Sequence, residues 1–443
     1  MKRKVLAMAL ISAMAVSSFT ACGGTDDKGD AKGTEKTEAP AEKPAPPAEK
    51  QDVALTMWGA EEDQAMLQKM VDEFKEEYKD YANFDIQLGV ESESTAKDTV
   101  LKDPTAAADV YAFASDQLPD LVKADALLAL DEVEEAVKTY AGKTLDDIKS
   151  ANASGSVDAA TSDGKLYAFP MSADNGYFLY YDKNAVSSEQ AQSWDGILEA
   201  AKAAGKKAGM TLASGWYNAG FFYGAGFTTG LNEDGTTTCD WNGTSEDGYT
   251  GVQVVQAMNA IASNEAFMGI ADGDISNQIA AGSLCAVVSG TWDATAAQDA
   301  FGDGYAATKL PTFTCNGNQL QMGSAAGFKL VAVNKYSKQA GWAALLGEWI
   351  TNETNQNTRF AEREIGPSNI NAASTDAVSQ NIAIAGLSEQ SPYGIVQLVG
   401  GNFWDPTATF GQKVAAGDFA KADDSTIQAA LDEMVKGVTA AVE

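Results

Sequence analysis

The folded part of the chain opens with residues 53–90, VALTMWGAEEDQAMLQKMVDEFKEEYKDYANFDIQLGV, whose pattern indicates a strand, a helix and a second strand. Residues 53–58 form a short apolar run typical of a buried strand, followed by a polar loop at 59–63. Residues 84–90 alternate as a second strand. Between the strands, apolar residues recur at the spacing of one helix face: Leu67, Met70, Val71, Phe74 and Tyr78.

The same alternation of strand and helix continues along the chain. Further strands are predicted at 108–114, 166–170, 178–181, 286–290 and 328–333, and helices at 194–204, 340–352 and 425–442. Ser425 with Gln428 predicts a capping box at the start of the last helix. Strands separated by helices favour a parallel sheet covered on both faces. The chain of 443 residues is long enough for two such α/β domains.

Composition excludes several classes of function. A formal net charge of -31 argues against nucleic acid as a partner, since binding to phosphates relies on Lys and Arg. The absence of histidine removes Ser-His-Asp and Cys-His catalysis and the commonest ligand of catalytic zinc. We therefore expect no cofactor and no metal. Cys285 is predicted to be a buried free thiol, whereas Cys239 and Cys315 lack metal-binding spacing, and whether they pair is left open.

The N-terminus has the pattern of an export signal. Three basic residues at 2–4 precede an apolar stretch at 5–16, which is too short to span a bilayer. Residues 19–22, FTAC, resemble a lipobox in which Phe19 replaces the usual Leu. We predict that residues 1–21 are a lipoprotein signal peptide and that Cys22 is lipidated; ordinary secretion with cleavage nearby is the alternative. The lipid would then be the chain's only membrane attachment, on the extracytoplasmic face.

Residues 22–51 are rich in Gly, Ala, Pro and charged side chains. Such a segment has little apolar surface to bury, so we predict a flexible tether between the anchor and the folded part.

Several short motifs in the folded part occur in a recognisable order. They are Trp58 at the end of the first strand, ADV at 108–110, GKLYAFP at 164–170, YDKN at 181–184, SGTW at 289–292 and GPS at 366–368. Together they resemble the extracellular solute-binding proteins of ABC sugar importers, of the maltose and maltodextrin type. The resemblance covers most of the chain from about residue 55 to residue 435.

This resemblance implies a two-lobed periplasmic-binding-protein-like fold of type II, with a ligand cleft between the lobes and a hinge that the chain crosses three times. The crossings are expected near 172–175, 313–323 and 373–379. The N-terminal lobe would then comprise 52–172 plus 323–375, and the C-terminal lobe 175–314 plus 378–443.

Aromatic side chains are the first candidates for binding a sugar, because sugar rings present apolar C–H faces. Trp292 follows the SGT motif at a strand end, and Trp404 lies in a Gly-rich context; both match stacking platforms of the family. Trp216 and Tyr217 occupy a third aromatic position, and Phe113 falls where the family can carry another. For each of them the alternative is a place in the core.

Polar candidates follow from the same resemblance, since planar polar groups can bind sugar hydroxyls. Asp116 matches a family carboxylate, whereas Gln117 stands where maltose-type proteins have a cation, which would make this subsite neutral. Asp174 has a hinge-capping role as its alternative. The two acids after the first strand could instead be ordinary helix N-terminal acids. The full polar set is Glu61, Glu62, Ser115, Asp116, Gln117, Asp174 and Asp405.

The remaining tryptophans are interpreted as structural, with one undecided. Trp342 and Trp349 are seven residues apart on one helix face, a spacing typical of a core. Trp58 and Trp194 are also expected to be structural, whereas Trp241 is left open.

The resemblance implies a monomeric binding protein and not an enzyme. It would capture oligosaccharides and deliver them to the transmembrane subunits of an ABC permease, with maltose and α-1,4-linked maltooligosaccharides as our first choice and other oligosaccharides as the alternative. A lipid-anchored glycosidase is a rival, because paired carboxylates can suffice for glycoside hydrolysis. A surface adhesin is a third hypothesis, and it would expose a large apolar patch.

Overall fold

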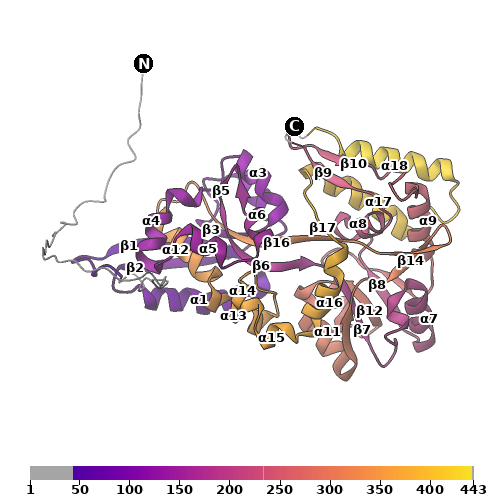
Figure 1. Cartoon of the computed structure of the whole chain (residues 1–443), viewed down its shortest axis with the longest axis horizontal. Helices are drawn as coiled ribbons and strands as arrows, with labels where there is room; N and C mark the ends of the chain where they lie inside the picture. Colours follow the sequence, from indigo (N-terminus) through magenta and orange to yellow (C-terminus); the bar gives the residue numbers. More distant parts are fainter. Residues whose placement is uncertain (1–42, 233, 442–443) are drawn as a thin grey trace, which may run out of the picture. The chain divides into compact units, whose positions relative to one another are not determined.

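The computed structural model describes residues 43–232 and 234–441, and in them the chain forms two separate hydrophobic cores around two main sheets (Figure 1). One core draws its residues from 53–171 and 330–350, and the other from 177–325 and 383–438. We call the parts around them the N-terminal lobe and the C-terminal lobe. The two-lobed α/β class is confirmed, while the boundaries given above stay a prediction.

The sheet of the N-terminal lobe has the strand order β17-β16-β3-β1-β2, with β6 also pairing with β16. Its strands are β1 (Gln51–Gly59), β2 (Ala82–Val90), β3 (Val110–Ala114), β6 (Ala168–Gly176), β16 (Ser324–Val333) and β17 (Gly394–Val396). The helices around it are α1 (Gln64–Glu77), α2 (Ala96–Lys102), α3 (Leu118–Lys123), α4 (Glu134–Ala141), α5 (Leu145–Ser150), α6 (Ser154–Ala159), α12 (Ala340–Thr351) and α13 (Glu353–Arg363). The first predicted strand, helix and strand are therefore confirmed as β1, α1 and β2.

The sheet of the C-terminal lobe has the order β11-β8-β12-β7-β13. Its strands are β7 (Phe178–Asp182), β8 (Lys207–Met210), β11 (Phe267–Gly269), β12 (Leu284–Ser289) and β13 (Tyr305–Thr308). The helices that contribute to this lobe are α7 (Trp194–Ala204), α8 (Gly215–Gly224), α9 (Gly251–Ala262), α10 (Ile275–Ala280), α11 (Ala294–Phe301), α16 (Ile382–Gln390), α17 (Trp404–Ala416) and α18 (Asp424–Val438).

Shorter elements complete the described chain. They are the hairpins β4 (Thr161–Ser162) with β5 (Lys165–Leu166), β9 (Thr229–Leu231) with β10 (Thr237–Cys239) and β14 (Thr312–Cys315) with β15 (Asn318–Gln321), the helices α14 (Ile370–Ala373) and α15 (Asp376–Ser379), and single 3-10 turns. Three of these turns, η1 (Glu61–Asp63), η2 (Ser115–Gln117) and η5 (Thr291–Asp293), directly follow the ends of main-sheet strands.

Both main sheets are mixed, so the prediction of a parallel sheet holds for only some of the strand pairs. β1 is parallel to β2 and β3, but β16 runs antiparallel to β3 and β6. In the other sheet β12 is parallel to β8 and antiparallel to β7. The physical reason is the path of the chain: β6 leads out of the first lobe and β16 leads back into it, so the two strands run in opposite directions side by side (Figure 1).

A single residue separates the two main sheets where β6 ends and β7 begins. This residue, Tyr177, is fully buried, and its hydroxyl accepts a hydrogen bond of 3.1 Å from the backbone N–H of Ala325 in β16. Its ring packs at 5.0 Å from Tyr217 and 5.8 Å from Trp216. Tyr177 therefore joins the strand that leaves the first lobe to the strand that returns.

Several local predictions are resolved by packing. The helix α18 is capped by Asp423, whose carboxylate accepts from the N–H of Thr426, so the capping box predicted at Ser425 is wrong. Trp241 is fully buried and stacks on Phe222 at 4.2 Å. The three cysteines of the described chain, Cys239, Cys285 and Cys315, are free thiols. Among the described residues, no helix has the length and apolarity needed to cross a bilayer.

A buried ion pair ties the loop after β1 to helix α13. The Asp63 carboxylate contacts the Arg359 guanidinium and lies 3.0 Å from Nε of Arg363. The side chains of Asp63 and Arg359 are 4% and 2% exposed. Burial alone would raise the pKa of Asp63, but Arg359, Lys329 and Arg363 together hold it below its ordinary value.

We expect Asp63→Asn to lower the free energy of unfolding by about 3–5 kcal/mol, because it leaves the Arg359 charge buried without its partner. Asp131→Asn is the matched control: Asp131 pairs with Lys165 at 3.5 Å, both side chains are about half exposed, and such pairs contribute roughly 0–1 kcal/mol. Denaturant unfolding measures both variants. Equal stability losses would show that the Asp63 pair is not a buried structural contact.

Candidate functional site

Trp292 lies where the central strand of the C-terminal lobe ends. β12 is buried throughout, and the chain then turns at Gly290 into η5, which carries Trp292. The half-buried indole lies directly against Gly290, because a Cβ there would stand 2.2 Å from two of its ring carbons. Glycine at this position therefore allows the indole to approach the strand end closely.

Trp216 and Tyr217 lie in the first turn of α8, next to Trp292. Burial holds the pKa of the Tyr217 phenol above its ordinary value, and hydrogen bonding with Ser289 and Trp292 only partly opposes this rise. Because Ser289 is the last residue of β12, the phenol lies beside the end of that strand. Tyr217 is 5% exposed, whereas Trp216 is half-buried. The two residues thus differ, because Tyr217 is buried and contacts Trp292, whereas part of the Trp216 ring is exposed to solvent.

Trp404 starts α17, and this helix end packs against the start of α8 (Figure 1). A Cβ on Gly215 would lie 2.1 Å from Oγ1 of Thr407, and Asn218 donates 3.0 Å to the Thr407 carbonyl. Trp404 is half-buried and stands edge-on to Phe403, with ring centroids 5.2 Å apart. The structure therefore brings the predicted aromatic residues Trp292, Trp216, Tyr217 and Trp404 together in one lobe.

Asp116 lies where β3 of the N-terminal lobe ends, in the turn η2. The residue is half-buried. Desolvation by the surrounding protein raises the pKa of the carboxyl to about 6, and the negative charge of Asp120 adds to this rise. A backbone N–H and the charge of Lys97 oppose it. At neutral pH the carboxylate is ionised and can accept hydrogen bonds from hydroxyl groups.

The neighbours of Asp116 in the predicted set face the interior of the lobe. Phe113 is 0% exposed in the N-terminal core. The Ser115 hydroxyl accepts from the N–H of Phe328 at 3.1 Å. Gln117 is 4% exposed, and its amide is used within the lobe by the backbone of residues 93, 94 and 97. The expected ligand contacts of these three side chains are corrected accordingly, because no free surface remains on the ring and the polar groups bind backbone.

Asp174 is buried and uses its carboxylate within the protein, which agrees with the alternative of a hinge-capping role. It is 3% exposed in β6, and its Oδ2 accepts from Oγ1 of Thr291 at 2.5 Å and from the N–H of Gly366 at 2.6 Å. A Cβ on Gly366 would lie 2.7 Å from that of Asp174, so the approach requires glycine. One carboxylate therefore joins the hinge strand to a loop of each lobe, and Thr291 is the residue before Trp292.

The other predicted acids are exposed. Glu61 and Glu62 lie in η1 after β1, where Glu62 is 3.8 Å from Arg363, and Asp405 lies in the first turn of α17. All three can reach solvent, and their positions also suit plain helix N-terminal acids.

Two lysines of the N-terminal lobe reach the C-terminal lobe, and the sequence did not single them out. Lys123 donates to the carbonyl of Asp234 at 3.3 Å. A Cβ on Gly401 would lie 3.6 Å from Nζ of Lys97. Both lysines are in short helices with ordinary surface patterns, so no periodicity or motif marks them. Through these lysines, the helices that flank the turn of Asp116 contact the C-terminal lobe, and the contact of Lys97 is with the segment that leads to Trp404.

A comparison with protein families is decisive at this point. The family model described as bacterial extracellular solute-binding protein matches residues 69–386. The chain belongs to this family. Its members are solute-binding proteins and not enzymes.

This solute-binding protein is similar in sequence or fold to several known proteins. It is 25% identical over 306 residues to the galactooligosaccharide-binding protein of Bacillus subtilis (strain 168), which covers 66% of this chain and 70% of the relative. A solved structure of a protein with acarbose is 26% identical, with a TM-score of 0.76 over 88% of this chain and 99% of the other. The maltodextrin-binding protein MalE1 from L. casei BL23 is 22% identical, with a TM-score of 0.70 over 88% and 100%.

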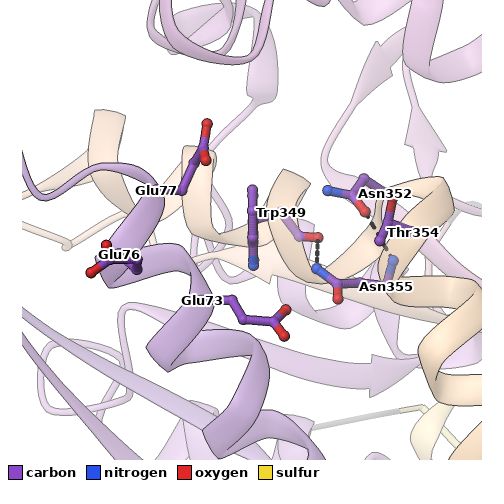
Figure 2. A pocket seen from close by; sticks show the side chains of 7 residues that line it. All are labelled: Glu73, Glu76, Glu77, Trp349, Asn352, Thr354 and Asn355. Atoms are coloured by element: carbon purple, nitrogen blue, oxygen red, sulfur yellow. Dashed lines mark hydrogen bonds between the residues drawn. The ribbon is translucent and has the colours of Figure 1, made fainter.

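Two surface cavities of this solute-binding protein lie away from the residues described above. One of about 470 Å³ is formed by α1 and the turn between α12 and α13, and Figure 2 shows the three acids of α1 on one side of Trp349 and Asn352, Thr354 and Asn355 on the other. Glu76 and Glu77 there pair with Lys79 and Lys43. The other, of about 540 Å³, is lined by polar residues of α9 and α18. Neither includes a predicted site residue, and neither is surrounded by exposed aromatic faces.

Proposed function

We propose that this solute-binding protein captures oligosaccharides between its two lobes and delivers them to the transmembrane subunits of an ABC permease. The observation that carries the proposal is the gathering of Trp292, Trp216 and Trp404 in the C-terminal lobe, each with part of its ring free. Such rings offer flat apolar faces for the C–H faces of sugars. Asp116, at the edge of the other lobe, offers an acceptor for their hydroxyls.

Maltooligosaccharides of α-1,4-linked glucose are our first choice of ligand. A protein of 26% identity was solved with acarbose, and further proteins with this fold are described as binding maltodextrin or maltotriose. The relative named as binding galactooligosaccharides supports these as the second candidate. A panel of purified oligosaccharides in calorimetry, with both classes present, separates the two.

The protein would work as a monomer attached to the outer face of the cell membrane by a lipid on Cys22. Support comes from the signal-like N-terminus and the Pro- and Gly-containing tether, which lie mostly outside the described residues. Membership in an extracellular family agrees with export.

Trp292→Ala and Trp404→Ala are expected to weaken sugar binding. Each removes an apolar face that stacks on a sugar ring, at a cost of about 1–3 kcal/mol, which is roughly a ten- to hundredfold loss of affinity. Because both rings are half-buried at loop ends, the melting temperature should change little. Calorimetric titration and thermal unfolding of the same samples measure the two quantities.

The matched control is Trp342→Ala, which truncates a tryptophan that is 7% exposed and packs 5.0 Å from Phe84 and from Tyr140. This variant should lose about 3–5 kcal/mol of stability through a core cavity, with sugar affinity retained in the folded fraction. If the first two variants bound every tested sugar as tightly as the unmodified protein, the proposed site would be incorrect.

Cys22→Ser is expected to release the protein from the cell envelope into the medium, because the lipid-bearing side chain is lost. Sugar affinity of the released protein should equal that of the wild-type folded part, since the tether lies outside the site. Fractionation followed by calorimetry checks both points. Retention of the variant in the membrane fraction would contradict lipidation at this residue.

A further inference from the structure

Lys97 lies at the junction between the two parts of the proposed site. It is the second residue of α2, and its side chain is only 14% exposed. Its Nζ is 3.1 Å from Oδ2 of Asp120 and 3.8 Å from Oδ1 of Asp98. The same ammonium lowers the pKa of Asp116 through its charge, so it lies within electrostatic reach of that carboxylate.

The other side of Lys97 faces the C-terminal lobe. A Cβ on Gly401 would lie 3.6 Å from Nζ of Lys97 and 3.8 Å from Oδ2 of Asp120. Gly401 opens the short turn that leads directly to Trp404. The ammonium therefore lies close to Gly401, in the segment that carries a proposed stacking ring. Through the backbone N–H of Lys97 and Gln117, α2 also contacts η2, the turn that carries the carboxylate proposed to bind sugar hydroxyls.

We propose that Lys97 is a specificity-determining residue of the sugar site, whose ammonium donates a hydrogen bond to a ligand hydroxyl between Asp116 and Trp404. This inference rests on the proposed function. An ammonium has three N–H donors, and the closest carboxylate, Asp120, uses one of them. A sugar hydroxyl can accept a hydrogen bond from a second N–H of the Lys97 ammonium and donate its own O–H to the Asp116 carboxylate. The subsite is then a charged donor and acceptor pair and not the neutral one that Gln117 suggested.

Gln117 acts as a positioning residue for Lys97. Its Oε1 accepts from the backbone N–H of Lys97 at 2.8 Å, and its Nε2 donates to the carbonyls of Glu93 and Ser94 at 2.7 and 3.0 Å. The buried amide thus ties the start of α2 to η2, the turn that carries Asp116. The spacing between the ammonium and the carboxylate is fixed by these backbone contacts.

Another lysine near the strand ends, Lys329, is a weaker candidate because its charge is used within the lobe. Its Nζ is 3.7 Å from Oε2 of Glu93. Burial alone would lower the pKa of Lys329, but Glu93, Asp174 and Asp63 raise it above its ordinary value. These carboxylates surround the ammonium.

The test measures affinity for maltotriose, or for the tightest sugar of the panel, across pH 4.5–8. In the wild-type protein, binding should weaken as pH falls through about 6, because protonation removes the negative charge of Asp116 and makes it a weaker acceptor for a hydroxyl. The charged groups around Asp116 are Lys97 and Asp120, with Asp98 beside Lys97.

Lys97→Met should cost roughly tenfold or more in affinity at pH 7.5 through loss of a charged donor. It should also move the midpoint to higher pH, because the positive charge that lowers the pKa of Asp116 is gone.

Two variants control for a structural effect. Lys97→Arg keeps the charge, so the pH midpoint should stay near that of the wild type. Lys123→Met removes the other lysine that reaches across the lobes, which binds a carbonyl and does not act on Asp116, so affinity and midpoint should both stay near wild type. Thermal unfolding confirms that each variant is folded.

Wild-type affinity in Lys97→Met, or a loss without a shift of the midpoint, would overturn the inference. If Trp292→Ala and Trp404→Ala still weaken binding in that case, the proposed function stands and only the role of Lys97 falls. If no sugar binds the wild-type protein, the proposed function fails and the inference fails with it.

Discussion

The antiparallel ladder between β6 and β16 is the constraint on which the rest of the structure depends. It runs from Ala326 opposite Gly176 to Ala332 opposite Ala168, and it joins the strand leaving the first lobe to the strand returning to it. One residue beyond β6, the buried Tyr177 hydroxyl extends the connection by accepting from Ala325. Because β6 and β16 are hydrogen-bonded to each other, we expect any movement of one lobe relative to the other to be a rotation about these two strands.

Charged side chains next to this crossing contact loops of both lobes. Asp174 binds Thr291 of one lobe and the Gly366 N–H of the other, and Lys329 stands among Asp174, Glu93 and Asp63. These contacts link the loops at the strand ends to one another. Asp116 and Trp292, which lie next to them, remain half-buried. If these two residues bind a sugar as proposed, contacts already made within the protein would lower the entropic cost of binding.

Strong local patterns made much of the fold predictable. The helix expected at 194–204 is α7, and the strand, helix and strand within 53–90 are β1, α1 and β2, because apolar periodicity directly encodes which face is buried. Strand direction was not predictable, since it depends on the path of β6 and β16 between lobes. The same limit applies to caps: Asp423 and Ser425 are both good capping residues, and only the backbone geometry decides between them.

The partial exposure of a candidate side chain was predictable where an aromatic residue follows a strand end and a glycine, as at Trp292. It was not predictable for Phe113 and Gln117, because a residue's position in a motif does not reveal whether its side chain faces the core or solvent. Lys97 carried no signal at all, since its importance comes from contacts with residues distant in sequence.

The central claim is that a sugar bound between the lobes contacts both of them, so that binding favours the closed arrangement by the difference in affinity for the two states. Small-angle X-ray scattering of the soluble folded part, with and without a saturating oligosaccharide, tests this most directly. The account predicts a smaller radius of gyration with the sugar bound. An unchanged radius of gyration with a tightly bound sugar would contradict it.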